Sequence, residues 1–145
     1  MAVTTIHTDL QDSLVELTDL ALQGKQLHWN LVGRGFKSLH EQLDELVDRA
    51  RTAADAVAER AVTLGHSPDG RALTVAKESP LAAVADGRIA DTAAVAHVVA
   101  VLTTVVDRMR ERIARREDDL VTQDLLIGIV AGLEKQRWMF DAQQS

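Results

Sequence analysis

The sequence has no cysteine and no tyrosine, and only two prolines and two tryptophans among its 145 residues. Without cysteine, disulfide staples and thiolate metal sites are excluded, which fits a reducing compartment. No apolar run approaches the roughly 20 residues of a membrane helix, and no basic-then-apolar signal peptide begins the chain. We therefore expect a cytoplasmic protein with no membrane segment.

The charge balance is acidic, with a formal net charge of −6 at pH 7. Such a surface repels nucleic acid and membranes on average and favours cations. Hydrophobic residues make up 46% of the chain and charged residues 26%, which is the balance of a soluble globular protein. The length suits one domain, so we expect a single domain over residues 1–145.

Sparse proline and glycine, with abundant alanine, leucine, valine and charged residues, favour helix. Apolar residues at helical spacing predict four long helices. The first covers Thr8–Leu31, the second starts at Phe36 and stops at the turn Gly65–Gly70, the third runs from Ala90–Thr92 to Ile113, and the last follows the polar break Arg116–Thr122. Phe36 is expected on the apolar face of the second helix, and Asp91 or Thr92 as the N-cap of the third.

The lengths of the connections predict the topology. The first two helices are tightly joined, as are the last two, so each pair must be antiparallel. About 25 residues, with a short helix at Arg71–Glu78, join the two pairs; a helix of about 26 residues is roughly 39 Å long, and this linker can run back along it. The predicted fold is all-α, a ferritin-like four-helix bundle with one long crossover that carries a short helix.

Histidines and acids gather on the first two helices. His28 lies in the leucine stripe of the first, whereas His40, Asp44, Asp55 and Glu59 form a strip beside the apolar face of the second. His40/Asp44 and Asp55/Glu59 are i, i+4 pairs, and all four residues lie within about 100° around the helix. Imidazole and carboxylate together suit divalent first-row metals, Fe(II) among them.

A structural interpretation stays open for each of these residues. Two acids at i and i+4 usually belong to a solvent-exposed charged surface beside the apolar face of a helix. Arg51 on the same strip favours that interpretation. A lone histidine in an apolar stripe is more often a satisfied core residue than a ligand. The Glu-x-x-His motif of bundle di-metal sites is missing from the sequence, so a site in the middle of the bundle is not expected.

Helix rise limits how the strip can bind one metal. Asp44 and Asp55 are about 16 Å apart along the axis at 1.5 Å per residue, too far for one centre. An antiparallel two-fold dimer brings His40 and Asp44 of one subunit opposite Asp55 and Glu59 of the other. The predicted site lies at a dimer interface.

These residues resemble a known family. "HWN" with His28, "LHEQLDEL" with His40 and Asp44, the spacing to Asp55 and Glu59, the "GHSPDGR" turn and the closing "LEKQRWMF" are similar to Dps proteins, the DNA-binding proteins from starved cells, or mini-ferritins. The resemblance spans nearly the whole chain.

The resemblance implies a bacterial, hollow homo-dodecamer of two-fold dimers that oxidises Fe(II), preferably with hydrogen peroxide, stores ferric mineral and protects against oxidative damage. It implies a two-iron ferroxidase site with His28, His40 and Asp44 from one subunit and Asp55 and Glu59 from its mate.

Four further residues match the family in position. Trp29 and Trp138 correspond to tryptophans near the iron centre that could absorb stray oxidising equivalents, and packing at an interface explains them equally well. Asp119 and Asp124 correspond in spacing to acids of three-fold pores, although acids at a helix N-terminus also stabilise the helix dipole.

The family name also suggests a rival function, DNA binding and compaction of the nucleoid. The family usually relies on a lysine-rich tail, but "MAVTTIHTD" and "DAQQS" at the two ends carry no lysine or arginine. The basic "RMRERIARR" is interleaved with acids and is interpreted as a helix face. We expect weak or absent DNA binding, and the pattern assigns no role to His7, His66 or His97.

Overall fold

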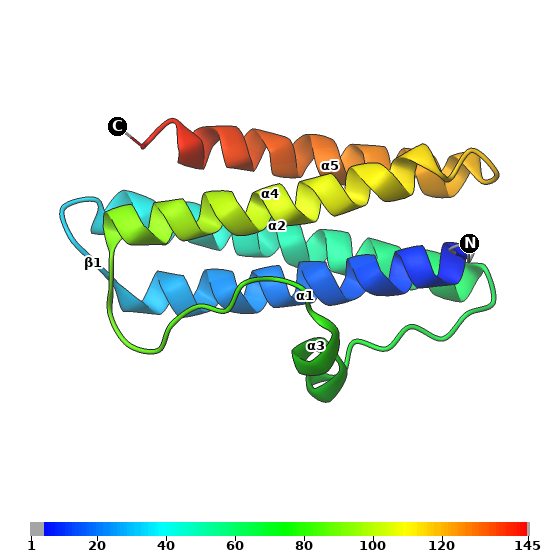
Figure 1. Cartoon of the computed structure of the whole chain (residues 1–145), viewed down its shortest axis with the longest axis horizontal. Helices are drawn as coiled ribbons and strands as arrows, with labels where there is room; N and C mark the ends of the chain where they lie inside the picture. The colour runs from blue at the N-terminus through cyan, green and yellow to red at the C-terminus, as the bar shows by residue number, and fades with distance from the viewer. Residues whose placement is uncertain (1–4, 145) are drawn as a thin grey trace.

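The computed structural model describes residues 5–144, which form four long helices and one short one. The long helices are α1 (Ile6–Asn30), α2 (Phe36–Thr63), α4 (Asp91–Ala114) and α5 (Leu120–Asp141), and they lie side by side along their lengths (Figure 1). The short helix α3 (Ala72–Glu78) lies in the connection between α2 and α4. The predicted all-α bundle with a long crossover is confirmed.

The helices pack as two pairs, α1 against α2 and α4 against α5. The crossover leaves the end of α2, carries α3 past the middle of α1, and returns along α1 to the start of α4 (Figure 1). Two short strands, β1 (Leu31–Val32) and β2 (Ile89–Ala90), pair in parallel and join the α1–α2 turn to the end of the crossover. Two-residue strands have no periodicity, so the sequence pattern could not predict them.

The leucine and valine stripes of the four helices form one continuous core. On α2 the predicted apolar face is buried at Leu39, Leu43, Leu46, Val47, Ala50, Ala54 and Val57. Phe36 differs from expectation, because its side chain is 41% exposed. Its ring stacks on His40 instead, with ring centroids 5.0 Å apart. The first aromatic of α2 therefore covers a candidate ligand instead of filling the core.

The start of α4 also differs from expectation. Ala90 occupies the N-cap position and provides no side-chain cap, and Asp91 is the first helical residue. The Asp91 carboxylate accepts hydrogen bonds from the main-chain N–H groups of Gly35 (2.8 Å) and Thr92 (2.8 Å). The prediction of Asp91 or Thr92 as the N-cap is therefore wrong, and Asp91 instead connects the start of α4 to the α1–α2 turn.

The expectation that no segment is apolar enough to cross a membrane is corrected by α4. Its 24 residues include a window with a mean hydropathy of 1.4, so by length and composition alone it could cross a membrane, contrary to the expectation that no segment reaches this limit. In the bundle, its valines and leucines pack against α5 and α1. This is the environment of a core helix, and it accounts for the composition without a membrane.

Close approach of α1 and α2 depends on Gly24. A Cβ atom added there would lie 2.6 Å from Cγ2 of Val47 on α2, inside van der Waals contact. Because glycine has no Cβ, the two helices can approach closely one turn before His28. This contact brings the histidines of the two helices within reach of each other.

Candidate metal centre

His28 and His40 meet where α1 ends and α2 begins. His28 is in the last turn of α1 and is 6% exposed, as its place in the leucine stripe predicts. His40 is in the second turn of α2 and is half-buried. Their rings stack with centroids 3.5 Å apart and planes 12° from parallel. Two candidate ligands from different helices are therefore adjacent in one chain.

Each ring is oriented by the main chain of the other helix. Nδ1 of His28 lies 2.6 Å from the carbonyl oxygen of His40, and Nδ1 of His40 lies 2.8 Å from the carbonyl oxygen of His28. A carbonyl oxygen can only accept, so Nδ1 carries the proton in both rings. A neutral ring in that tautomer has its lone pair on Nε2, and neither Nε2 has a hydrogen-bond partner among residues 5–144. Metal-binding histidines usually have this arrangement, with the second ring nitrogen donating to a carbonyl or carboxylate.

Asp44 adds a carboxylate to the pair. Its Oδ1 accepts a short hydrogen bond from Nζ of Lys25 and lies 3.5 Å from Nδ1 of His28. The hydrogen bond from Lys25 holds the pKa of the Asp44 carboxyl below its usual value, and the charge of Lys25 acts in the same direction. Asp44 is therefore an ionised candidate oxygen ligand beside two imidazoles.

Asp55 and Glu59 lie further along α2, away from this group. Both side chains are exposed, and neither carboxylate has a hydrogen bond or ion pair within residues 5–144. In that part of the chain, no three histidine, cysteine, aspartate or glutamate side chains are close enough together to hold a metal ion. Within one chain, His28, His40 and Asp44 are therefore neighbours that do not by themselves form a three-ligand metal site, and the two remaining acids lie apart from them.

Both tryptophans are on the surface of the single chain. Trp29, which follows His28, is 67% exposed, and Trp138 on α5 is 66% exposed. Trp29 lines a groove of about 480 Å³ between α1 and the crossover, together with Leu22, Val75, Leu81 and Val84. Exposed apolar side chains such as Trp29 and Leu22 beside one groove are typical of a protein interface.

The two candidate pore acids have different surroundings. Asp119 is the N-cap of α5, where its carboxylate accepts from the N–H groups of Val121 and Thr122 and pairs with Arg60 at 3.1 Å. These hydrogen bonds, that of the Thr122 hydroxyl first, hold the pKa of Asp119 below its usual value. Asp124 is exposed and has no ion pair within residues 5–144.

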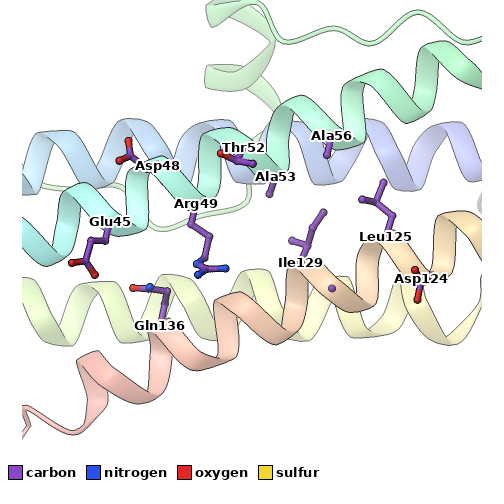
Figure 2. A pocket seen from close by; sticks show the side chains of 11 residues that line it. Glu45, Asp48, Arg49, Thr52, Ala53, Ala56, Asp124, Leu125, Ile129 and Gln136 are labelled. Carbon is purple, nitrogen blue, oxygen red and sulfur yellow. The ribbon is translucent and has the colours of Figure 1, made fainter.

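Another groove, of about 740 Å³, lies elsewhere, between α2 and α5 (Figure 2). Arg49 on α2 and Gln136 on α5 point into it, and Asp124 lies at its other end. Gln136 is 4% exposed, and its Oε1 has no hydrogen-bond partner among the described residues. The sequence pattern did not single out this groove, and it contains none of the five predicted ligands.

Comparison with known proteins identifies relatives of this arrangement. The family model for the ferritin-like domain matches residues 8–145. The DNA protection during starvation protein of Mycolicibacterium smegmatis is 40% identical over 92% of this chain and 73% of its own length.

Two solved structures are similar to the whole bundle. The structure of Dps92 from Deinococcus radiodurans has a TM-score of 0.93 and 35% identity, covering 94% of this chain and 84% of that one. Dps from Microbacterium arborescens in the high iron form has a TM-score of 0.89 and 31% identity, covering 98% and 96%.

Proposed function

From the premise that the chain belongs to the Dps group of the ferritin-like family, which stores iron and protects cells, we propose that it is a ferroxidase. In this proposal the whole chain, residues 1–145, is one domain. It oxidises Fe(II) at sites shared between two subunits, preferably with hydrogen peroxide, and it stores the ferric product inside a hollow dodecamer in the bacterial cytoplasm.

The orientation of His28 and His40 carries this proposal. Each ring bonds through Nδ1 to a main-chain carbonyl, which leaves its Nε2 lone pair available to a metal ion. The Nε2 atoms of the two rings and the ionised Asp44, whose Oδ1 lies 3.5 Å from Nδ1 of His28, are ligands of a kind suited to Fe(II).

A second copy of the chain would supply Asp55 and Glu59. Both acids are exposed and unpaired in the described chain, as ligands of a partner's metal must be. The groove between α1 and the crossover offers an apolar surface, with Leu22 54% and Trp29 67% exposed. Burying such a surface by two-fold symmetry would favour a dimer of this chain.

The proposed reaction takes two Fe(II) ions and one peroxide. Each Fe(II) gives up one electron, the O–O bond breaks, and two protons complete two water molecules, so no hydroxyl radical is released. The carboxylates Asp44, Asp55 and Glu59 favour the harder ferric product, and the imidazoles help to hold Fe(II). Trp29, beside His28, and Trp138 would absorb oxidising equivalents that escape.

Stopped-flow absorbance of Fe(II) oxidation tests the proposal. The wild-type protein should react faster with peroxide than with dioxygen, and the combined His28→Ala, His40→Ala and Asp44→Ala variant should lose this activity. His97→Ala is the matched control, because His97 bonds Gln23 on α1 and lies outside the site. An unchanged rate in the triple variant would remove the ferroxidase assignment.

DNA compaction is the alternative function, with iron oxidation secondary. The arginines of "RMRERIARR" argue against this alternative, because they form ion pairs with acidic residues of the same chain. Arg108 and Arg112 bind Glu16, Arg110 binds Glu134, and Arg115 and Arg116 bind Asp9. These ion pairs leave little positive charge in this segment to bind DNA phosphates. They support the expectation that DNA binding is weak.

A further inference from the structure

Two histidines that the sequence pattern left without a role meet in the structure. His7 is in the first turn of α1, and His66 is in the loop that follows α2. Their ring centroids are 4.6 Å apart, with planes 34° from parallel. At 1.5 Å per residue, roughly 30 Å of α1 separates His7 from His28, so this pair lies at the opposite end of the bundle.

Nδ1 of His7 is buried and has no hydrogen-bond partner among residues 5–144. Buried polar nitrogens in native proteins are almost always paired, and an exception points to a water molecule or an ion. The nearest aromatic neighbour of this ring is the second imidazole. The environment therefore offers an unused nitrogen beside another potential ligand.

The loop that carries His66 is held firmly against α1. The side-chain amide of Gln11, one turn after His7, donates to the carbonyl oxygen of Asp69 at 2.8 Å and accepts from its N–H at 2.9 Å. The main-chain N–H of His66 donates to the carbonyl oxygen of Ala61 at 2.9 Å. The main chain that carries His66 is thus held in place beside α1 before any ligand arrives, which lowers the entropy cost of binding.

The ring separation suits two imidazoles on one ion. With a metal–nitrogen distance of about 2.0–2.1 Å, two rings bound side by side have centroids roughly 4.5–5 Å apart. The carboxylate of Asp69 is not available as a third ligand, because Arg71 and Thr74 bind it.

We propose that His7 and His66 form a second metal site, which takes a divalent late first-row transition ion and leaves its remaining positions to water. Two neutral imidazoles favour Cu²⁺ most strongly, and Zn²⁺ and Ni²⁺ less. The site does not depend on the proposed ferroxidase function, because it uses none of those ligands.

Titration calorimetry with Cu²⁺ and with Zn²⁺ tests the site in three proteins: wild type, His66→Ala and the control His97→Ala. We expect wild type and His97→Ala to bind one more ion per chain than His66→Ala, with affinity for Cu²⁺ at least tenfold above that for Zn²⁺. Fe(II) oxidation by His66→Ala should match wild type, so failure of this site and failure of the ferroxidase proposal are distinguishable. Equal stoichiometry in all three proteins overturns the proposal.

Electron paramagnetic resonance of Cu²⁺ supplies a second measurement that does not need the His66 variant to fold. In the His28→Ala, His40→Ala protein, only His7, His66 and His97 remain as imidazoles. One equivalent of Cu²⁺ should show coupling to two imidazole nitrogens. Coupling to one nitrogen or to none contradicts the paired site, whatever the calorimetry gives.

Discussion

His28 and His40 each donate Nδ1–H to the main-chain carbonyl oxygen of the other, which interlocks the end of α1 with the beginning of α2. The carbonyl of His28 lies in the last turn of its helix, where no intrahelical donor remains, and the His40 ring supplies one. The candidate ligands therefore also stabilise the contact between the two helices. Ligand geometry and helix packing in this protein depend on the same pair of bonds.

Complementation between two inactive variants should restore activity, because we propose that each site takes histidines from one chain and acids from its mate. One variant carries His28→Ala and His40→Ala, the other Asp55→Ala and Glu59→Ala. Random mixing makes about half of the dimers hybrid, each with one intact site, so roughly a quarter of wild-type activity should return.

The mixed protein should be prepared by co-expression with two affinity tags, so that hybrid dimers can be confirmed, and assayed for Fe(II) oxidation. The control is a mixture of the two variants made after separate assembly. Confirmed hybrid dimers that oxidise Fe(II) no faster than the parent variants would contradict the shared-site model.

Gly33→Ala should destabilise the turn that precedes the His40 helix. Gly33 has φ of +130°, a conformation that disfavours any side chain, and an added Cβ would lie 2.5 Å from the Asp91 carboxylate. We expect a loss of about 1–3 kcal/mol, measured by denaturant unfolding. Gly128→Ala on α5 is the control, because a Cβ there contacts nothing within 4 Å. Equal stability of the two variants would contradict this account of the turn.

Asp119→Ala should lower stability by about 1 kcal/mol at pH 7, the usual loss of a helix N-cap. The pKa of Asp119 is depressed in the folded state, so its contribution is complete above the unfolded pKa of about 3.9 and falls as pH drops through the folded pKa. The difference between wild type and variant should therefore shrink below about pH 4. Thermal unfolding across pH measures it, with Asp124→Ala as a control expected to show no such dependence.

Asp124→Asn should slow iron uptake without loss of stability, if Asp124 is the acid that attracts Fe(II) at the proposed pore. Its carboxylate is exposed and unpaired in the described chain. The Asp119 carboxylate, in contrast, forms an ion pair with Arg60 and caps the N-terminus of α5. Salt weakens attraction of this kind, so the defect should be largest at low ionic strength. Iron incorporation followed by absorbance tests it, and an unaltered rate at low salt would exclude the pore role.

DNA binding by the 145-residue chain should be weak near neutral pH. The net charge is −6, and the arginines of the basic segment Arg108–Arg116 are paired within the chain. A gel shift of the assembled protein at physiological ionic strength should show no stable complex. Salt-sensitive binding under those conditions would favour the nucleoid function instead.

Much of this protein could be predicted from local patterns. The apolar stripes predicted the long helices, and the connection lengths predicted the crossover, because helical periodicity and chain reach depend only on neighbouring residues. The burial of His28 followed from its place in the stripe. The distance along α2 from Asp44 to Asp55 likewise followed from helix rise, which is why a shared site could be predicted before any coordinates.

Only the tertiary structure decided the contacts that depend on the path of the whole chain. His7 and His66 meet because the loop after α2 folds back on α1, and Asp91 joins the α1–α2 turn because the crossover ends there. The reciprocal bonds of His28 and His40 likewise required the packed helices. Periodicity determines which face a residue occupies; it cannot determine which distant residue that face meets, because many chain paths satisfy the same pattern.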